Sequence, residues 1–147
     1  MNYMDLNSGI INAYVHSGLN RNKVNALKYL NKHYGVEKFY VNVFPDLYLP
    51  NPPSVISSLN KPVFIEIKNG YGKLTDNQKK MFSMLSKSIP IFILRIFNRS
   101  KVVKLFRIRA ESEVFVSNLN LFELDDKEVL ERIHKKYPGL DNEPVIK

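Results

Sequence analysis

The chain has 147 residues, a length typical of one domain built around one hydrophobic core. Hydrophobic residues make up 44% of it, which excludes a disordered class, and the absence of cysteine excludes disulfides, thiolate metal sites and cysteine nucleophiles. No apolar run reaches the roughly 18 residues of a membrane span, so we expect a single intracellular, cytoplasmic domain over residues 1–147 with no membrane contact.

The net charge of +8 is unevenly distributed. Residues 1–60 carry five Lys/Arg and three Asp/Glu, residues 61–110 twelve against two, and residues 111–147 five against nine, so the middle segment alone has a net charge of +10. Such a basic segment favours a polyanionic partner, because neutralising phosphates releases bound counterions. The alternative is a basic surface that only contacts solvent.

The first half of the chain predicts one helix and two strands. Residues 22–34 have apolar positions at helical spacing, and Gly35 is a typical C-terminal stop. Residues 37–44 alternate and are rich in Phe, Tyr and Val, which indicates a strand. The proline-rich residues 50–53 cannot form a central strand, whereas residues 62–68 predict a second one.

The basic middle segment predicts a turn, a helix and a hairpin. Residues 69–73 contain two glycines and indicate a turn, and residues 75–86 have part of an apolar helix face. Two apolar, β-rich runs at 90–97 and 101–109 are joined by residues 98–100, which predicts a hairpin.

The last part of the chain predicts one strand and one helix. Residues 114–122 indicate the strand. Residues 126–136 have acidic residues in their first turn and basic residues in their last, as helices prefer. The fold class is therefore α/β or α+β, with a central mixed sheet flanked by helices.

Three polar residues of the predicted strands form a candidate reaction centre. Pro45 ends the strand before it and leaves Asp46 on a turn. Glu66 and Lys68 project from the same face of the strand at 62–68, because side chains alternate between faces. If these two strands are neighbours, Asp46 and Glu66 converge, with Lys68 just beyond them. The alternative is that Glu66 and Lys68 are solvated residues of a half-exposed strand.

Two converging carboxylates are suitable ligands for Mg²⁺, which is usually held by one or two carboxylates and by substrate phosphate. The ion would stabilise negative charge on a scissile phosphate and lower the pKa of a bound water. Lys68 would position that water, help to deprotonate it and face the phosphate. No residues with the arrangement of a covalent nucleophile are visible, which agrees with direct attack by water.

Residues 44–96 resemble the PD-(D/E)xK nuclease superfamily, and most closely its VRR-NUC and archaeal Holliday-junction-resolvase-like branches. The motif core spans residues 36–97. The matching residues are Pro45-Asp46-Leu47, Glu66-Ile67-Lys68, Leu74, Gln78 and the apolar run 91–96.

The resemblance implies a restriction-endonuclease-like core and a Mg²⁺-dependent DNA endonuclease, with Mn²⁺ able to substitute. It implies that Asp46, Glu66 and the backbone carbonyl of Ile67 ligate the metal, that Lys68 assists the attacking water, and that Gln78 supports the site. It also implies a preference for branched DNA and a homodimer with paired active sites.

Two features depart from the family's pattern or leave a choice open. Members often carry a further glutamate on the first helix, whereas residues 23–25 hold no acid, and Asp5 is the alternative source. Gln78 also completes Thr75-x-x-Gln78, the pattern of a capping box, and one side chain can hardly both cap a helix and support an active site.

The remaining candidates are contacts to DNA. The residues 70–73 lack the spacing of a nucleotide-binding P-loop, so they indicate either a plain turn or a DNA-contacting loop, with Tyr71 stacking and Lys73 on phosphate. The other predicted phosphate contacts are Lys79, Lys80, Arg95, Arg99, Lys101 and Arg107. The three histidines show no ligand spacing.

Two functional hypotheses follow. The first is a Mg²⁺-dependent nuclease, of a size that suits a virus or a mobile element. The second is a nucleic-acid-binding module on the same fold that no longer cuts. A pure binding module has no use for Asp46 and Glu66, whose charges repel phosphate unless a cation lies between them, and this favours the first hypothesis.

Overall fold

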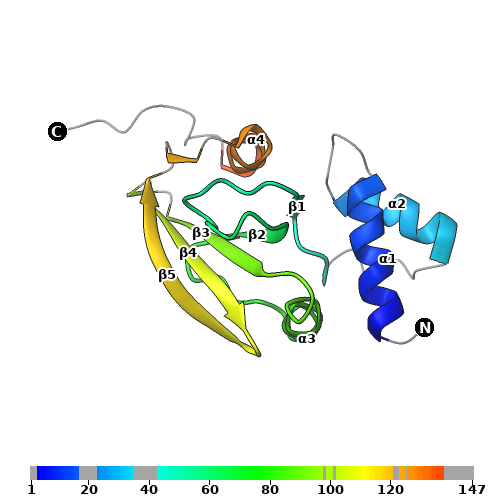
Figure 1. Ribbon diagram of the computed structural model, residues 1–147. Coiled ribbons are helices and arrows are strands. Elements are labelled where there is room, and N and C mark those ends of the chain that lie inside the picture. Colours follow the sequence, from blue (N-terminus) through cyan, green and yellow to red (C-terminus); the bar gives the residue numbers. More distant parts are fainter. Residues whose placement is uncertain are drawn as a thin grey trace.

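The computed structural model describes residues 3–16, 23–34, 43–97, 99–100, 102–120, 123–124 and 126–137. These residues form four helices and one five-stranded sheet (Figure 1). The helices are α1 (Tyr3–His16), α2 (Lys23–Tyr34), α3 (Asp76–Leu85) and α4 (Lys127–Lys136). The strands are β1 (Leu47–Leu49), β2 (Val63–Asn69), β3 (Ile91–Phe97), β4 (Val102–Arg109) and β5 (Ser112–Asn120).

The sheet is mixed, with the strand order β1-β2-β3-β4-β5. Strands β2 and β3 are parallel and are connected through α3, whereas the other three pairs are antiparallel. Parallel neighbours need such a crossover, while antiparallel neighbours such as β3 and β4 need only a short turn. The predicted class of a mixed sheet flanked by helices is confirmed.

Helices cover both faces of the sheet, and the core is correspondingly divided into two clusters. On one face, Val129 and Ile133 of α4 pack against residues of all five strands. On the other face, α1, α2 and α3 contribute buried residues such as Tyr14, Leu30 and Phe82. Figure 1 shows α4 above the sheet, α3 below it, and α1 and α2 beside it. No helix of the described segments is long and apolar enough to cross a membrane.

The helices predicted at 22–34, 75–86 and 126–136 are confirmed, as are the strands at 62–68, 90–97, 101–109 and 114–122, with slightly different bounds in the described part of the chain; residues 22, 101, 121 and 122 lie outside it. The first helix, α1, was not predicted. Of the strand predicted at 37–44, residues 37–42 lie outside the described part of the chain, and residues 43–44 are not in a strand. Asp46 therefore precedes a short strand, β1, that the sequence did not indicate.

The turn predicted after β2 is present and depends on a glycine. Gly70 has a φ of +49°, a left-handed conformation that residues with a Cβ atom rarely adopt. Its N–H donates to the carbonyl of Ile96 over 2.8 Å, so the chain turns at the end of the parallel pair. The turn directs Tyr71 outward, where its side chain is 68% exposed.

Candidate active site

Asp46 and Glu66 lie together because β1 and β2 are antiparallel. Leu47 pairs with Ile65, so Asp46, one residue before β1, comes opposite Glu66, one residue further along β2. Each side chain belongs to a residue that is only 2% exposed. The N–H of Ile67 donates to Asp46 Oδ2 over 2.9 Å. The two carboxylates thus meet at the edge of β2, just before the first residue of β1.

The backbone beside Asp46 is held by α1. The hydroxyl of Tyr14, a fully buried residue of that helix, donates a hydrogen bond to the carbonyl of Pro45. This contact fixes the turn from which the Asp46 side chain projects. A helix that the sequence did not predict therefore helps to position a residue that it did.

Lys68 and Glu66 are joined through Gln78 at the start of α3. Gln78 Nε2 donates to Glu66 Oε2 over 3.1 Å, and Lys68 Nζ donates to Gln78 Oε1 over 3.2 Å. The sequence brings these residues together because Glu66 and Lys68 share one face of β2 and α3 begins next to that face. The three predicted residues form one connected polar group.

Gln78 also completes a capping box at the N-terminus of α3. The N–H of Thr75 donates to Gln78 Oε1 and the N–H of Gln78 donates to Thr75 Oγ1, each over 3.1 Å. The prediction that one side chain can hardly do both was wrong. The amide oxygen accepts the capping bond and the Lys68 bond, and this leaves the amide nitrogen free to reach Glu66.

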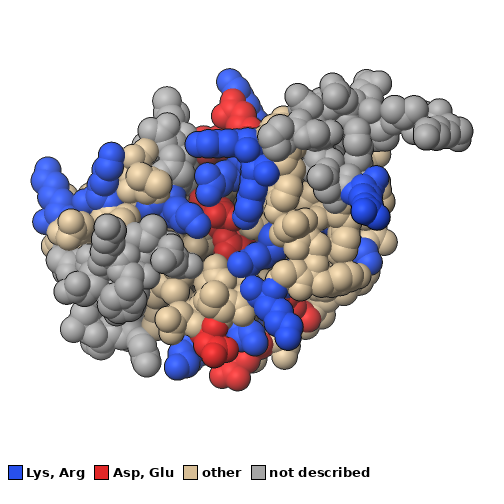
Figure 2. Space-filling view, turned by 180° about the vertical axis from the view of Figure 1, so that it is seen from behind, with Lys and Arg blue, Asp and Glu red and all other residues tan. Residues whose placement is uncertain are grey.

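Three cationic side chains surround the carboxylates, and none of them was predicted. Lys23 Nζ of α2 lies 3.1 Å from Asp46 Oδ1, and Arg132 Nη2 of α4 lies 3.3 Å from the same oxygen. Lys136 Nζ, one helical turn after Arg132, donates to the carbonyl of Ile67 over 2.9 Å. Figure 2 shows acidic surface recessed among lysine and arginine side chains on this side of the molecule.

A cation lies where the resemblance to the nucleases predicted a further glutamate. Where a further glutamate was expected, α2 begins with Lys23, which compensates Asp46 rather than adding a ligand. The alternative source, Asp5, lies in α1, but its side chain is outside the part of the structure that is described. In the described part of the chain, the site therefore contains the carboxylates of Asp46 and Glu66.

The two carboxyl groups have opposite pKa shifts. Burial raises the pKa of Glu66 well above its ordinary value of 4.5, and the negative charge of Asp46 raises it further. Burial alone would also raise the pKa of Asp46. A hydrogen bond with Glu66, the charge of Lys23 and the N–H of Ile67 outweigh it and lower this pKa from 3.8 to about 2. Of the two carboxyl groups, Glu66 therefore holds a proton more tightly and Asp46 carries the negative charge more readily.

The donor set fits a hard divalent cation. It consists of two carboxylates and the backbone carbonyl of Ile67, all oxygen, as Mg²⁺ prefers. Among the described residues, no group of three or more His, Cys, Asp and Glu side chains could hold a metal, so the backbone carbonyl is needed as the third donor. Lys23, Arg132 and Lys136 now donate to two of these three groups. The positive charges of these side chains thus lie where a bound divalent cation would place its own charge.

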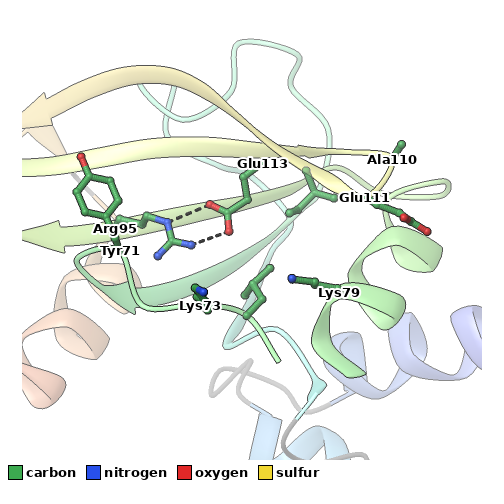
Figure 3. A pocket seen from close by; sticks show the side chains of 9 residues that line it. Tyr71, Lys73, Lys79, Arg95, Ala110, Glu111 and Glu113 are labelled. Atoms are coloured by element: carbon green, nitrogen blue, oxygen red, sulfur yellow. Dashed lines mark hydrogen bonds and ion pairs between the residues drawn. The ribbon is translucent and has the colours of Figure 1, made fainter. Parts of the chain in front are cut away.

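Most of the predicted DNA contacts are exposed. Lys73, Lys79, Lys80 and Arg99 are exposed and Lys101 lies outside the described residues. Arg107 is partly buried, with its guanidinium 5.6 Å from the centre of the Phe92 ring. Tyr71, Lys73 and Lys79 also line a pocket of about 330 Å³ between the sheet and α3 (Figure 3).

Arg95 is a correction to the predicted phosphate contacts. Its residue is only 5% exposed, and two of its nitrogens bind the carboxylate of Glu113 over 3.0 and 2.6 Å (Figure 3). The remaining terminal nitrogen donates to the carbonyls of Gly70 and Gly72 over 2.9 and 2.6 Å. Arg95 therefore anchors the turn after β2, and an ion pair with a residue on β5 was not visible in the sequence.

Comparisons with protein-family models, with curated proteins and with solved structures found no match. The site is therefore interpreted from its own geometry. The sequence identified the two carboxylates, Lys68 and Gln78, because each belongs to a short local pattern: alternation along one strand, a turn after a proline, or the start of a helix. It missed Arg132 and Lys136, although their spacing of four residues places both on one face of the predicted helix.

Proposed function

We propose that this chain is a Mg²⁺-dependent endonuclease that hydrolyses phosphodiester bonds of DNA, with its reaction centre at Asp46, Glu66 and Lys68. The observation that carries the proposal is a pair of buried, hydrogen-bonded carboxylates, Asp46 and Glu66, with Lys68 joined to Glu66 through the amide of Gln78. Burying two carboxylates side by side is costly unless a cation or a proton is shared between them. A divalent metal held by these carboxylates would supply that cation.

Each residue has a distinct part in the proposed reaction. Asp46, Glu66 and the Ile67 carbonyl would hold Mg²⁺, which when bound stabilises the charge that develops on the phosphate and acidifies a water. Lys68 faces the attacking water and keeps it oriented through a hydrogen bond. Gln78 fixes the positions of the Lys68 ammonium and the Glu66 carboxylate relative to each other. This matters because a small misplacement of reacting groups lowers the reaction rate strongly.

The surrounding cations suit the substrate. Lys23, Arg132 and Lys136 contact the acceptors of the site directly. With Mg²⁺ bound to these acceptors, the three side chains would be available to bind the oxygens of the scissile phosphate and of its neighbours. Charge-assisted hydrogen bonds to phosphate are stronger than neutral ones, so the exchange would position the DNA.

The family assignment remains part of the proposal. A mixed sheet, a parallel pair joined by a helix, and an acid-x-Lys strand beside an Asp are compatible with a PD-(D/E)xK nuclease with a restriction-endonuclease-like core. The resolvase-like resemblance adds a preference for branched DNA, a homodimer and an intracellular site of action. Gel filtration of DNA-free protein tests the dimer, and a strict monomer would count against it.

The proposed activity is tested by cleavage of labelled linear, single-stranded, flapped and four-way-junction DNA, with Mg²⁺ and with EDTA. We expect cutting that requires the metal, is lost in Asp46→Asn and Lys68→Ala, and is kept in Lys61→Ala, an exposed lysine before β2. Unfolding curves of all variants check their fold. Cleavage that survives in Asp46→Asn, or in EDTA, would refute the assignment of this reaction centre.

The second candidate is a DNA-binding module on the same fold that does not cut. It is favoured by one observation: Lys23, Arg132 and Lys136 already neutralise Asp46 and bind the Ile67 carbonyl without a metal. Calorimetric titration with Mg²⁺ and Mn²⁺ separates the two candidates. A wild-type protein that binds DNA, binds neither metal and cuts no substrate is the binding module.

A further inference from the structure

A group of aromatic side chains shares one face of the sheet with Glu66 and Lys68. Across the strands, Lys68 pairs with Arg95 and Arg95 with Lys104, while Glu66 pairs with Ile93 and Ile93 with Phe106. Cross-strand partners project from the same face. This face is covered by α3 and its neighbours only over part of its area, and its remaining part carries the aromatic residues described next.

These residues form two ring pairs, which we call the aromatic face: Tyr71, Phe97, Phe106 and Phe115, together with Lys104. Tyr71 and Phe97 meet edge to face with their centres 4.9 Å apart, and Phe106 and Phe115 do so at 5.6 Å. Tyr71 is 68% exposed and Phe115 is 52% exposed. Large apolar rings exposed in a group usually mark a binding surface.

Lys104 connects the aromatic face to the charge of the molecule. Its ammonium lies 5.6 Å from the centre of the Tyr71 ring and 5.3 Å from that of Phe97, and it donates to the Tyr71 hydroxyl over 3.1 Å. A cation held over one exposed ring, Tyr71, and one partly buried ring, Phe97, can bind a phosphate while a flat group stacks on the exposed ring. This is the arrangement with which proteins hold unpaired nucleotides.

The pocket beside the aromatic face extends this basic surface towards α3. Tyr71, Lys73 and Lys79 line it, and Figure 3 shows Glu111 at its far end, next to Ala110. The carboxylate of Glu113 points into the same region, but it is neutralised by Arg95. Lys73 and Lys79 are both exposed in this pocket, Lys79 on α3 towards Glu111 (Figure 3), and the two lysines favour an anionic occupant.

We propose that the aromatic face binds a single-stranded segment of DNA, with bases stacked on Tyr71 and Phe115 and phosphates on Lys73, Lys79 and Lys104. The inference rests on the proposed function in one respect, since the bound strand would lead to the carboxylates of the same sheet face. It names the substrate class: DNA with an unpaired segment beside the bond that is cut. Stacking tolerates every base, so little sequence preference is expected.

Binding is measured by fluorescence anisotropy in EDTA with a labelled oligo-dT of about 16 nucleotides, the upper end of the length that such surfaces cover. We expect Tyr71→Ala to weaken binding about 5- to 150-fold, the effect of losing one stacked base. Tyr71→Phe keeps the ring and should bind within about twofold of the wild type. Lys104→Ala should weaken binding and reduce its salt dependence.

The matched control is Leu59→Ala, which removes an apolar side chain that is 54% exposed in a second pocket with Val114 and Val116, whose side chains project from the face of the sheet opposite to Phe115. It should leave affinity unchanged, and none of the variants should alter binding of a blunt duplex by more than about twofold. A 2-aminopurine base in the oligonucleotide reports stacking directly, and its fluorescence response should be lost in Tyr71→Ala.

Three results would overturn the proposal: affinity for the single strand that Tyr71→Ala and Lys104→Ala leave unchanged, equal losses for single strand and duplex, or Tyr71→Phe as weak as Tyr71→Ala. Its failure is distinguishable from failure of the nuclease. If Asp46→Asn abolishes cleavage while Tyr71→Ala binds single-stranded DNA normally, the nuclease proposal is supported and the proposed role of the aromatic face is refuted. If no DNA is cut, the anisotropy measurements still test the aromatic face.

Discussion

The carboxylate site and the aromatic face lie on one face of the same sheet, yet they are built in opposite ways. Asp46 and Glu66 are each 2% exposed and are held by side chains from three helices, whereas Tyr71 and Phe115 are more than half exposed. Burial strengthens electrostatic interactions and is suited to chemistry. Exposed rings are suited to a partner that arrives and leaves. If the proposed function holds, this sheet separates the residues that cut DNA from those that bind it.

Lys68 lies where the two regions meet, so it gives the largest expected effect. Lys68→Met should reduce cleavage by about 10²- to 10⁴-fold, because a positioned group that handles the proton of the attacking water is lost. Affinity for single-stranded DNA should change by no more than about threefold, since one phosphate contact at most is removed. Single-turnover cleavage and anisotropy measure the two quantities. Equal losses in both would show that Lys68 only binds DNA.

Arg95 holds the turn that carries Tyr71 of the aromatic face, and Arg95→Met should show how much this contact contributes to stability. The change leaves Glu113 without its partner and frees the carbonyls of Gly70 and Gly72, so we expect the free energy of unfolding to fall by about 3 kcal/mol. Chemical denaturation measures it. The control is Lys127→Ala, which breaks an exposed ion pair with Glu131 and should change little.

The pH dependence should distinguish the two regions as well. Because the pKa of Glu66 is raised, its proton must leave before a metal binds, and Mg²⁺ affinity should rise about tenfold per pH unit until that pKa is passed. Calorimetry in buffers of different ionisation enthalpy should detect about one released proton. Binding of single-stranded DNA in EDTA should be nearly constant over the same range. A flat metal affinity would contradict the shared proton.

The same shifts set the stability of the metal-free protein. Stability contributed by Asp46 is present above its ordinary pKa of 3.8 and is lost as the pH falls towards about 2. Stability contributed by protonated Glu66 is present below 4.5 and is lost as the pH rises through its raised pKa. Unfolding of Glu66→Gln should lack the second loss.

The smallest expected effect separates the two tasks of Gln78. Thr75→Ala removes the acceptor of the capping box and should cost about 1 kcal/mol of stability, while cleavage stays near the wild-type rate because the contacts of Gln78 to Glu66 and Lys68 remain. Gln78→Ala should cost similar stability but also lower cleavage. If Thr75→Ala loses as much activity as Gln78→Ala, the site depends on helix capping alone.

Local patterns in the sequence predicted most of the fold that the structure describes. The strands after residue 60 and helices α2, α3 and α4 follow from alternation, helical spacing and turn residues, which act over short distances. Strand β1 has three residues and is too short to show alternation. Lys23 of α2 and Arg132 of α4 pair with Asp46 before β1, and Lys136 of α4 binds the Ile67 carbonyl of β2; such contacts depend on packing rather than on local pattern.

The shortness of β1 has a consequence for aggregation. Because β1 begins opposite Ile65, it does not pair with the backbone of Ile67, which lies at a sheet edge, and exposed edges can recruit strands of other molecules. In the described chain, side chains close this edge: Asp46 accepts from the Ile67 N–H and Lys136 donates to its carbonyl. Lys136, which the proposed function would release from this carbonyl, thus also helps to keep the protein from adding strands at this edge.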